Sequence, residues 1–370
     1  MTDTTQGTQR TAPAASGNDY VLEIDDLHTH FFTNEGVVKA VDGVSMKLQR
    51  GKTLAVVGES GCGKSITARS ILQIVDKPGR IVSGSIKLHR SGREGRSAGT
   101  IDLAALDPKS KVLRDVRGKD ISMIFQEPMT SLSPVHTIGN QIREAVLTHF
   151  DVSKEEAHER AVESLRLVGI PRPDRQVDRY PFQLSGGMRQ RAMIAMALVG
   201  RPDILIADEP TTALDVTTQA QILDLIRELQ SELGMSLIMI THDLGVVAEM
   251  ADDVAVMYLG TVAEEGTVDQ IFHEPRHPYT RALLRSVPRV GEHERSKRLY
   301  TIAGSVPNPY SRPTGCPYST RCDFYMDGLC NKVVPPPIAF DETHKARCLL
   351  YTNAGVQYME RERQEKGVTA

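Results

Sequence analysis

The 370-residue sequence lacks the features of a membrane-spanning or nucleic-acid-binding protein. It contains no apolar run that approaches the roughly 18 residues a membrane helix needs. Its net charge of -3 provides no basic field that would attract nucleic acid or an anionic membrane. Hydrophobic residues make up 40% of the chain and charged residues 25%, as in folded globular proteins. We therefore expect a globular protein with no nucleic-acid partner.

An export signal is also missing from the beginning of the sequence. The first nineteen residues are rich in Thr, Ala, Gly and Gln and hold no apolar segment of the kind a secretory signal needs. We interpret residues 1–19 as a disordered tail. These absences predict a cytosolic protein that reaches a membrane only through partners. Cytosolic thiols stay reduced, which favours metal binding over disulfides for the five cysteines.

Short apolar runs alternate with amphipathic segments from about residue 20 to residue 272, which predicts a parallel α/β core. Strands are expected at residues 20–24 (as an edge strand), 37–48, 54–57, 204–207 and 237–240, and in a hairpin of 254–259 and 261–264. Helices are expected at residues 65–75, 154–167, 188–199 and 219–233, the last capped by Gly234. Residues 88–120 are polar and Gly-rich, and we interpret them as a variable, partly irregular insertion.

Residues 58–65 read Gly-Glu-Ser-Gly-Cys-Gly-Lys-Ser and fit the phosphate-binding pattern G-x-x-x-x-G-K-[ST]. Glycines let backbone N–H groups curl around phosphate oxygens, and a helix N-terminus favours anions. Lys64 is expected to reach the β- and γ-phosphates, and Ser65 to ligate Mg²⁺. A Gly-rich turn that matches by chance is the alternative, which the flanking strand and helix disfavour. The residues expected to line ATP here are Gly58, Ser60, Gly61, Cys62, Gly63, Lys64, Ser65 and Ile66.

The apolar strand at residues 204–207 ends in two carboxylates, Asp208 and Glu209. Strand ends deliver side chains to the ligand crevice of an open α/β sheet. Asp208 is suited to hold Mg²⁺, directly or through water, and Glu209 to orient and deprotonate the attacking water. A solvated strand end is the alternative for this pair by itself. The phosphate-binding loop upstream favours the catalytic interpretation.

Residues 184–188, Leu-Ser-Gly-Gly-Met, are the most specific of the remaining motifs. With this motif, the chain from about residue 20 to residue 272 resembles the ABC ATPase family. The resemblance implies that backbone groups of Ser185, Gly186 and Gly187 begin a helix and bind the γ-phosphate held by the opposite subunit. Met188 replaces the commoner Gln, a change that leaves these backbone donors in place.

Other residues match the motifs of this family in the expected order. Gln126 corresponds to the Q-loop glutamine, which senses Mg²⁺ and the transport partner, and Asp215 to the D-loop at the dimer interface. His242 corresponds to the switch histidine that contacts the γ-phosphate, although an isolated histidine at a strand end is usually structural. Phe31 is in place to stack on adenine, with neighbouring Phe32 as the alternative.

The resemblance implies a P-loop NTPase fold, in which a RecA-like parallel sheet with an antiparallel β subdomain carries an inserted helical subdomain at about residues 127–200. It also implies ATP hydrolysis at a site that two subunits share in a head-to-tail dimer. One subunit supplies the phosphate-binding loop and the acid pair, and the other supplies the signature. The expected catalytic residues are Glu209, His242 and Gln126, and the expected Mg²⁺ ligands are Ser65, Gln126 and Asp208.

Several short segments resemble one branch of the family, the ATPases of oligopeptide and dipeptide importers. They are residues 127–134, 277–284, 302–307 and 315–317. The resemblance implies a C-terminal extension at 273–350, followed by a charged tail at 351–370. It further implies a peripheral subunit on the cytoplasmic face of the membrane that energises peptide uptake. Expected partners are a second, homologous ATPase chain in a heterodimer, two transmembrane permeases and an extracytoplasmic binding protein. Importers of nickel, opines and some oligosaccharides share the extension, so these cargoes stay open.

Four of the five cysteines gather in the extension with the spacing C-x5-C-x7-C-x17-C: Cys316, Cys322, Cys330 and Cys348. Four thiolates can hold a [4Fe–4S] cluster or zinc, but the C-x2-C pairs typical of structural zinc are absent. Members of the resembled family carry a [4Fe–4S] cluster here, so we favour a cluster over zinc and over unligated thiols or disulfides. The fifth, Cys62, is interpreted as a small residue tolerated in its loop; a helix N-terminus that lowers its thiol pKa is the alternative.

Three other functions compete with an import ATPase. ABC ATPases of translation carry two cassettes, and those of DNA repair carry a long coiled coil; this chain has one cassette and no heptad run. A degenerate cassette that binds ATP without hydrolysing it is disfavoured by Glu209 and His242. An exporter subunit usually has a fused membrane domain or lacks the C-terminal extension.

Overall fold

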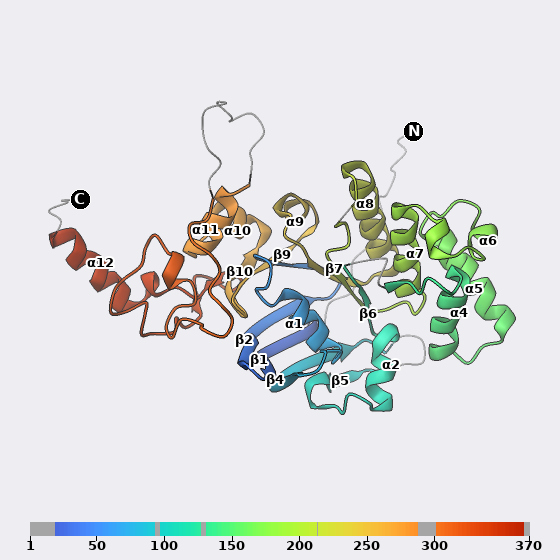
Figure 1. Ribbon diagram of the computed structural model, residues 1–370, viewed down its shortest axis with the longest axis horizontal. Coiled ribbons are helices and arrows are strands. Elements are labelled where there is room, and N and C mark those ends of the chain that lie inside the picture. Colours follow the sequence, from blue (N-terminus) through green and yellow to red (C-terminus); the bar gives the residue numbers. More distant parts are fainter. Residues whose placement is uncertain (1–18, 93–96, 127–130, 213, 288–300, 366–370) are drawn as a thin grey trace, which may run out of the picture.

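The structure is a computed structural model that describes residues 19–92, 97–126, 131–212, 214–287 and 301–365. In these ranges the chain forms a large sheet, a smaller antiparallel sheet and a loop-rich C-terminal part at one end of the molecule (Figure 1). The tail expected at residues 1–19 lies outside the described residues, apart from Asp19.

The larger sheet carries the parallel core that the sequence predicted. Its eight strands are β3 (Thr53–Val57), β6 (Ile121–Ile124), β7 (Ile204–Asp208), β8 (Ser236–Ile240), β9 (Asp253–Tyr258), β10 (Thr261–Thr267), β11 (Ile338–Ala339) and β12 (Lys345–Ala346). They are ordered β11-β12-β10-β9-β3-β8-β7-β6, and the five from β9 to β6 run parallel. β3, β7 and β8 are buried at every residue, as strands covered on both faces should be. The expected hairpin is confirmed as β9 and β10.

The smaller sheet corrects two expectations. Its strands are β1 (Tyr20–Thr33), β2 (Gly36–Gln49), β4 (Gly79–Arg90) and β5 (Gly99–Asp102), in the antiparallel order β2-β1-β4-β5. Residues 20–24 were expected in an edge strand, but β1 pairs with β2 on one side and with β4 on the other. The apolar residues of β1 can therefore be buried inside the sheet instead of at its edge. The irregular insertion expected at 88–120 instead contains β5, a 3-10 turn (Leu103–Ala105) and α2 (Lys111–Lys119). Leu103 and Leu113 anchor this segment in the core.

Helices cover the larger sheet and form a group of their own at one end (Figure 1). They are α1 (Lys64–Ile71), α4 (Ile138–His149), α5 (Lys154–Leu167), α6 (Pro173–Gln176), α7 (Gly186–Leu198), α8 (Val216–Leu233), α9 (Leu244–Met250), α10 (Val268–His273), α11 (Pro278–Arg285) and α12 (Asn353–Glu365). α8 buries the apolar face expected of it and ends at Gly234, whose φ of 64° is the predicted left-handed cap. The last helix occupies most of the segment we expected to be a charged tail.

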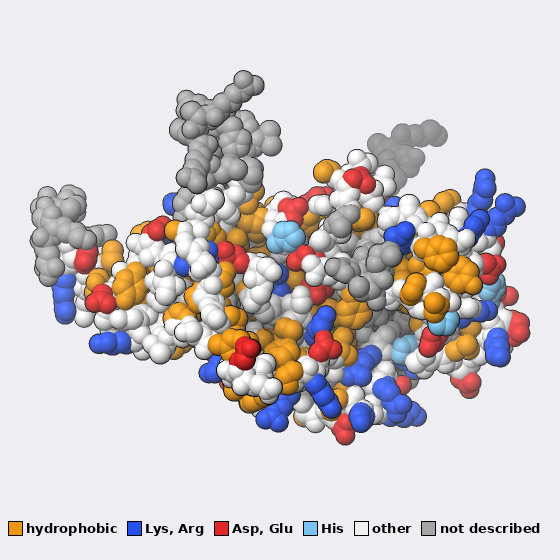
Figure 2. Space-filling model, in the orientation of Figure 1, with side chains coloured by type: hydrophobic (Ala, Val, Ile, Leu, Met, Phe, Trp, Pro, Cys, Tyr) orange, Lys and Arg blue, Asp and Glu red, His pale blue; other side chains and the backbone are white. Residues whose placement is uncertain are grey.

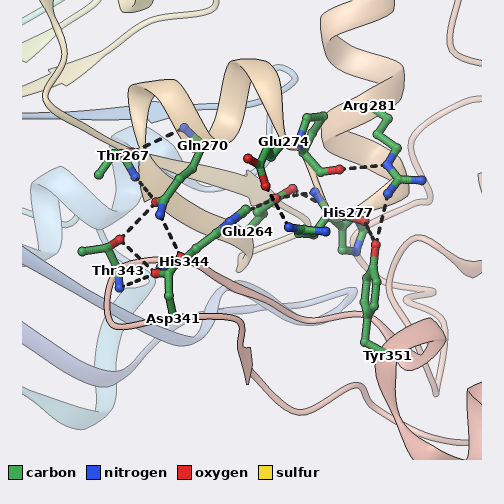
Figure 3. Close-up of polar contacts among 12 residues, drawn as sticks. Glu264, Thr267, Gln270, Glu274, His277, Arg281, Asp341, Thr343, His344 and Tyr351 are labelled. Atoms are coloured by element: carbon green, nitrogen blue, oxygen red, sulfur yellow. Dashed lines mark hydrogen bonds and ion pairs between the residues drawn. The ribbon is translucent and has the colours of Figure 1, made fainter.

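The C-terminal part docks on β10 through the buried carboxylate of Glu264, which is 1% exposed. This carboxylate accepts hydrogen bonds from the N–H groups of Arg276 (2.6 Å) and His277 (2.9 Å). His344 Nε2 lies 2.8 Å from the same carboxylate. Figure 3 shows Glu264 between the turn that precedes α11 and the loop that carries His344. Because β12 also pairs with β10, the C-terminal part continues the large sheet.

Candidate nucleotide-binding site

The loop at residues 58–65 connects the end of β3 to the start of α1. Gly58 and Gly63 have φ values of 148° and 103°. A Cβ atom would lie 2.2 Å from the carbonyl oxygen of Met257 at the first position and 2.3 Å from that of Ala40 at the second. Only glycine fits at both positions. The loop therefore has the tight curl that its motif predicted, with its N–H groups next to a helix N-terminus.

Lys64 is held inside this loop by backbone oxygens. Its Nζ donates to the carbonyl oxygens of Gly58 at 2.8 Å and Glu59 at 3.1 Å. The residue is only 6% exposed. The positive charge is thus fixed in place where a phosphate would sit on the loop.

Ser65 and Asp208 form the next part of the site. The Ser65 hydroxyl donates to Asp208 Oδ1 at 3.0 Å, which joins the first turn of α1 to the end of β7. Burial raises the pKa of the Asp208 carboxyl, and the hydrogen bond from Ser65 partly opposes this rise. A buried carboxylate and a hydroxyl beside a phosphate-binding loop are oxygen donors that suit Mg²⁺. The two side chains therefore fit the metal site expected of them.

Glu209 is the point at which three other side chains meet. Gln126 Nε2 donates to Glu209 Oε2 at 3.0 Å, and the Thr212 hydroxyl donates to the same oxygen at 2.9 Å. His242 Nδ1 lies 3.3 Å from Glu209 Oε1. The structure thus brings Gln126, Glu209 and His242 together, as a shared catalytic role requires. The sequence analysis missed Thr212; a hydroxyl in the turn just after the acid pair was the available signal.

The backbone at Glu209 sets the direction of this carboxylate. Glu209 has a φ of 49°, a left-handed conformation that is uncommon for a residue with a side chain. Its N–H donates to the carbonyl oxygen of Ile240 at the end of β8, at 2.9 Å. This bond ties the end of β7 to the strand that leads to His242. A rare conformation held by a neighbouring strand is typical of a functional position.

The signature residues lie together at the start of α7, away from the loop of α1 (Figure 1). Ser185 caps α7 by accepting the N–H of Met188 at 3.3 Å. Gly187 faces α8, since a Cβ there would lie 2.8 Å from the side chain of Thr218. Asp215 caps α8 by accepting the N–H of Thr218 at 2.9 Å. In the described part of the chain, no hydrogen bond joins Ser185, Gly186 or Gly187 to residues 58–65.

Phe31 and Phe32 lie on different faces of β1. Phe31 shares its face with Thr29, whose hydroxyl lies 2.8 Å from that of Ser70 in α1. Phe32 is 39% exposed, and the guanidinium of Arg80 lies 4.3 Å from the centre of its ring. Phe31 therefore lies on the side of β1 that faces α1, with its ring beside Gly79, which supports it over Phe32 as the adenine-stacking residue. That role remains a prediction.

Ile66 and Cys62 contribute mainly to packing. The side chain of Ile66 lies against the core beneath the smaller sheet. Cys62 is buried, and burial raises the pKa of its thiol more than neighbouring Lys64 lowers it. The direction of this shift is opposite to the lowered thiol pKa that was the alternative. The helix N-terminus does not compensate for the loss of water around this sulfur.

The four C-terminal cysteines converge without forming disulfides. Burial raises the pKa of Cys316 to about 11 and of Cys322 and Cys348 to about 12, and it also raises the pKa of Cys330. At Cys348 the thiols of the other three add to the rise, so all four lie within electrostatic reach of one another. Thiols with raised pKa values lose their protons when a positive charge lies beside them, and a bound metal supplies such a charge.

One set of three metal-type donor atoms within 4.8 Å of one another occurs in the described ranges: His28, His30 and Asp42. Asp42 already pairs with Arg312 at 2.7 Å, which occupies its second oxygen. No three of the cysteine sulfurs, all of them in described segments, are mutually that close. In the same described ranges, no helix is long and apolar enough to cross a membrane.

Two models of known protein families match this chain. A family model described as "ABC transporter" matches residues 41–212. A second, described as "Oligopeptide/dipeptide transporter, C-terminal region", matches residues 263–330. The first match contains the phosphate-binding loop, the signature and the acid pair, and the second contains three of the four clustered cysteines.

Relatives of nearly full length share about half of their residues with this chain. A putative peptide import ATP-binding protein of Brucella abortus is 51% identical over 89% of this chain and 96% of its own length. The dipeptide transport ATP-binding protein DppD of Bacillus subtilis is 48% identical over 89% of this chain and 94% of its own. The oligopeptide transport ATP-binding protein AppD of the same organism is 47% identical over 91% and 98%.

A similar solved structure is the ATP-binding cassette MJ0796, a dimer bound to ADP and phosphate in a post-hydrolysis state. It is 26% identical and superposes with a TM-score of 0.57. The match covers 67% of this chain and 98% of the cassette. The cassette part of the chain therefore has the fold of a known ABC ATPase.

Proposed function

Because this chain belongs to the ATP-binding proteins of the oligopeptide and dipeptide ABC import family, we propose that residues 58–65 and the acid pair form its site of ATP hydrolysis. The chain is the ATP-binding subunit of a peptide ABC importer, and its enzymatic activity is that of an ABC transporter ATPase. The observation that carries the site is the meeting of Gln126, Thr212 and His242 on Glu209.

In the proposed reaction, Lys64 and the loop N–H groups bind the β- and γ-phosphates of ATP. Ser65, Asp208 and Gln126 would hold Mg²⁺, which neutralises phosphate charge when bound. Glu209 orients the attacking water and takes its proton, and Gln126 and Thr212 aim the carboxylate. His242 is 64% exposed in its side chain, so it can turn from Glu209 towards the γ-phosphate. Phe31 stacks on the adenine.

The signature is proposed to act on ATP bound by another subunit. Ser185, Gly186 and Gly187 open α7, a helix whose N-terminal N–H groups suit a phosphate. Asp215 lies beside them at the start of α8, where a dimer interface would pass. The solved cassette that matches this chain is itself a dimer. ATP between the two subunits holds the dimer closed, and hydrolysis lets it open.

The wider assembly is proposed to follow the importer pattern. It joins this chain to a second, homologous ATPase, two transmembrane permeases and an extracytoplasmic binding protein, with this chain peripheral on the cytoplasmic face. Helices α4 to α7 would form the inserted helical subdomain at about residues 127–200. Figure 2 shows hydrophobic side chains gathered over this group of helices. Between α6 and α7, Phe182, 62% exposed, stacks on Tyr180; exposed aromatic side chains support a protein partner for this group of helices.

We propose that the extension at residues 273–350 holds a [4Fe–4S] cluster through its four cysteines. A zinc ion with Zn–S bonds of about 2.3 Å would draw its sulfurs to within roughly 4 Å of one another. No three of these sulfurs, all in described segments, lie within 4.8 Å of one another, which suits a cluster better.

Two measurements test these proposals. In vesicles with the permeases and the partner ATPase, dipeptides delivered by the binding protein should stimulate ATP hydrolysis, whereas Ni²⁺ should not. Stimulation by Ni²⁺ alone would make nickel the cargo. Protein purified without oxygen should contain about four iron and four sulfide per chain. Zinc, or no metal, in that material would contradict the cluster.

A further inference from the structure

Glu59, the second residue of the phosphate-binding loop, is bound by the C-terminal extension. Arg321 Nη1 donates to Glu59 Oε2 at 2.6 Å, and Nη2 donates to Oε1 at 3.0 Å. Two parallel bonds between a guanidinium and a carboxylate give both strength and a fixed geometry. The side chains are 3% and 26% exposed, respectively, so water screens this pair little.

Arg321 is itself immobilised by its surroundings. Its Nε donates to the carbonyl oxygen of Ala303 at 2.9 Å, and its Nη1 lies 3.3 Å from the hydroxyl of Tyr258. A guanidinium is always charged, so Arg321 brings a fixed positive charge to Glu59. Arg321 directly precedes Cys322, so the segment with the proposed cluster ligands also carries this contact.

A second residue of the C-terminal part, Tyr279, also binds Glu59. The N–H of Glu59 donates to the hydroxyl of Tyr279, at 2.9 Å, and Tyr279 is fully buried in α11. The carbonyl oxygen of Glu59 in turn accepts a hydrogen bond from Lys64 Nζ, at 3.1 Å. The extension thus fixes the residue that holds the phosphate-binding lysine.

Because Glu59 is negatively charged, its pairing with Arg321 affects how tightly the loop binds ATP. Its carboxylate lies in a loop that must accept a triphosphate, and like charges nearby repel. Arg321 pairs with the carboxylate and cancels most of that repulsion. We propose that the C-terminal extension sets the ATP affinity of the loop through Arg321, a positioning residue that neutralises and fixes Glu59. This inference rests on the proposed role of residues 58–65 in binding ATP.

The test compares three variants of the full chain by equilibrium binding of a fluorescent ATP analogue with Mg²⁺. Arg321→Met is expected to weaken binding about 10-fold, equivalent to about 1.4 kcal/mol. Glu59→Gln should bind as tightly as the unmodified chain or more tightly. The double variant should also recover the original affinity, because no unpaired carboxylate is left. In the assembled transporter, Arg321→Met should raise KM for ATP and leave kcat within about twofold.

Arg312→Met is the matched control. Arg312 also joins the extension to the cassette, through an ion pair with Asp42 at 2.7 Å. Asp42 lies outside the phosphate-binding loop of residues 58–65. This variant should keep its ATP affinity. If it weakens binding as much as Arg321→Met does, or if the double variant stays as weak as Arg321→Met, the effect is structural and the proposal is wrong. Unchanged binding by Arg321→Met would also overturn it.

The double variant, Arg321→Lys and Lys64→Ala distinguish the ways in which the proposal could fail. Replacing both partners of a buried pair is often tolerated, so the double variant tests the proposal even if Arg321→Met does not fold. Arg321→Lys keeps the charge, and binding near the original affinity is expected; a loss equal to that of Arg321→Met would contradict the role of charge. If Lys64→Ala binds ATP normally, the loop assignment itself fails. If Lys64→Ala loses binding while Arg321→Met does not, only the present proposal fails.

Discussion

The buried imidazole of His277 should make the stability of the chain fall in mild acid. His277 Nδ1 accepts the N–H of Tyr279 at 3.0 Å and caps α11. Burial is the main cause that lowers the pKa of His277 from 6.5 to about 4. The carbonyl group of Arg347 opposes this shift, and the charge of Arg281 adds to it. At neutral pH the ring is therefore neutral, with its proton on Nε2.

The sign and size of the effect follow from proton binding. Below pH 6.5 the unfolded chain takes up a proton on this ring, whereas the folded chain does so only near pH 4. The contribution of His277 to stability is thus fully present above pH 6.5 and is lost as the pH falls towards 4. One pH unit in this window is worth at most about 1.4 kcal/mol. Lowering the pH from 7 to 5 should cost about 2 kcal/mol.

The assay is urea denaturation followed by circular dichroism at several pH values, for the unmodified chain and for His277→Asn. Asparagine can still cap the helix but does not titrate. The variant should lose about 2 kcal/mol less between pH 7 and pH 5 than the unmodified chain. His273→Asn, at an exposed position, is the control and should keep the original pH dependence. Equal pH dependence in all three proteins would refute the reasoning.

Two other predictions concern the site directly. Gly58→Ala should abolish ATP binding and lower the melting temperature, because its Cβ would lie 2.2 Å from the Met257 carbonyl oxygen. Gly61→Ala is the comparison in a thermal melt: its Cβ would meet nothing within 4 Å, so only the strain of its φ of 77° remains and the melting temperature should fall less. Asp208→Asn should raise the Mg²⁺ concentration for half-maximal hydrolysis about 10-fold, because it removes the charge of a metal ligand. A magnesium titration of the assembled transporter measures this, and an unchanged midpoint would argue against Asp208 as a ligand.

Motifs whose chemistry is local could be predicted from the sequence. The curl of residues 58–65 follows from glycines that no other residue can replace, and the two carboxylates follow an apolar run that could only be a buried strand. The meeting of Gln126 with Glu209 was expected only through the family resemblance, because 83 residues separate them. The sequence identified the chemical groups of the site, and only the structure gave the distances between them.

Features that depend on distant partners were missed or placed wrongly. Alternation within residues 20–24 indicates a strand but does not say that β4 will cover its second edge. Residues 88–120 contain few apolar side chains, so their order depends on single anchors such as Leu113. The contact between Arg321 and Glu59 joins residues 262 positions apart and leaves no periodic signal.

The most direct test of the whole account is ATP turnover by Glu209→Gln in the assembled transporter. Loss of a general base should lower kcat about 10²- to 10⁴-fold, while the dissociation constant for ATP stays within about twofold. Glu228→Gln, on the exposed side of α8, should behave like the unmodified chain. If Glu209→Gln hydrolyses ATP at the original rate, the carboxylate at which Gln126, Thr212 and His242 meet is not the catalytic base, and the proposed site is wrong.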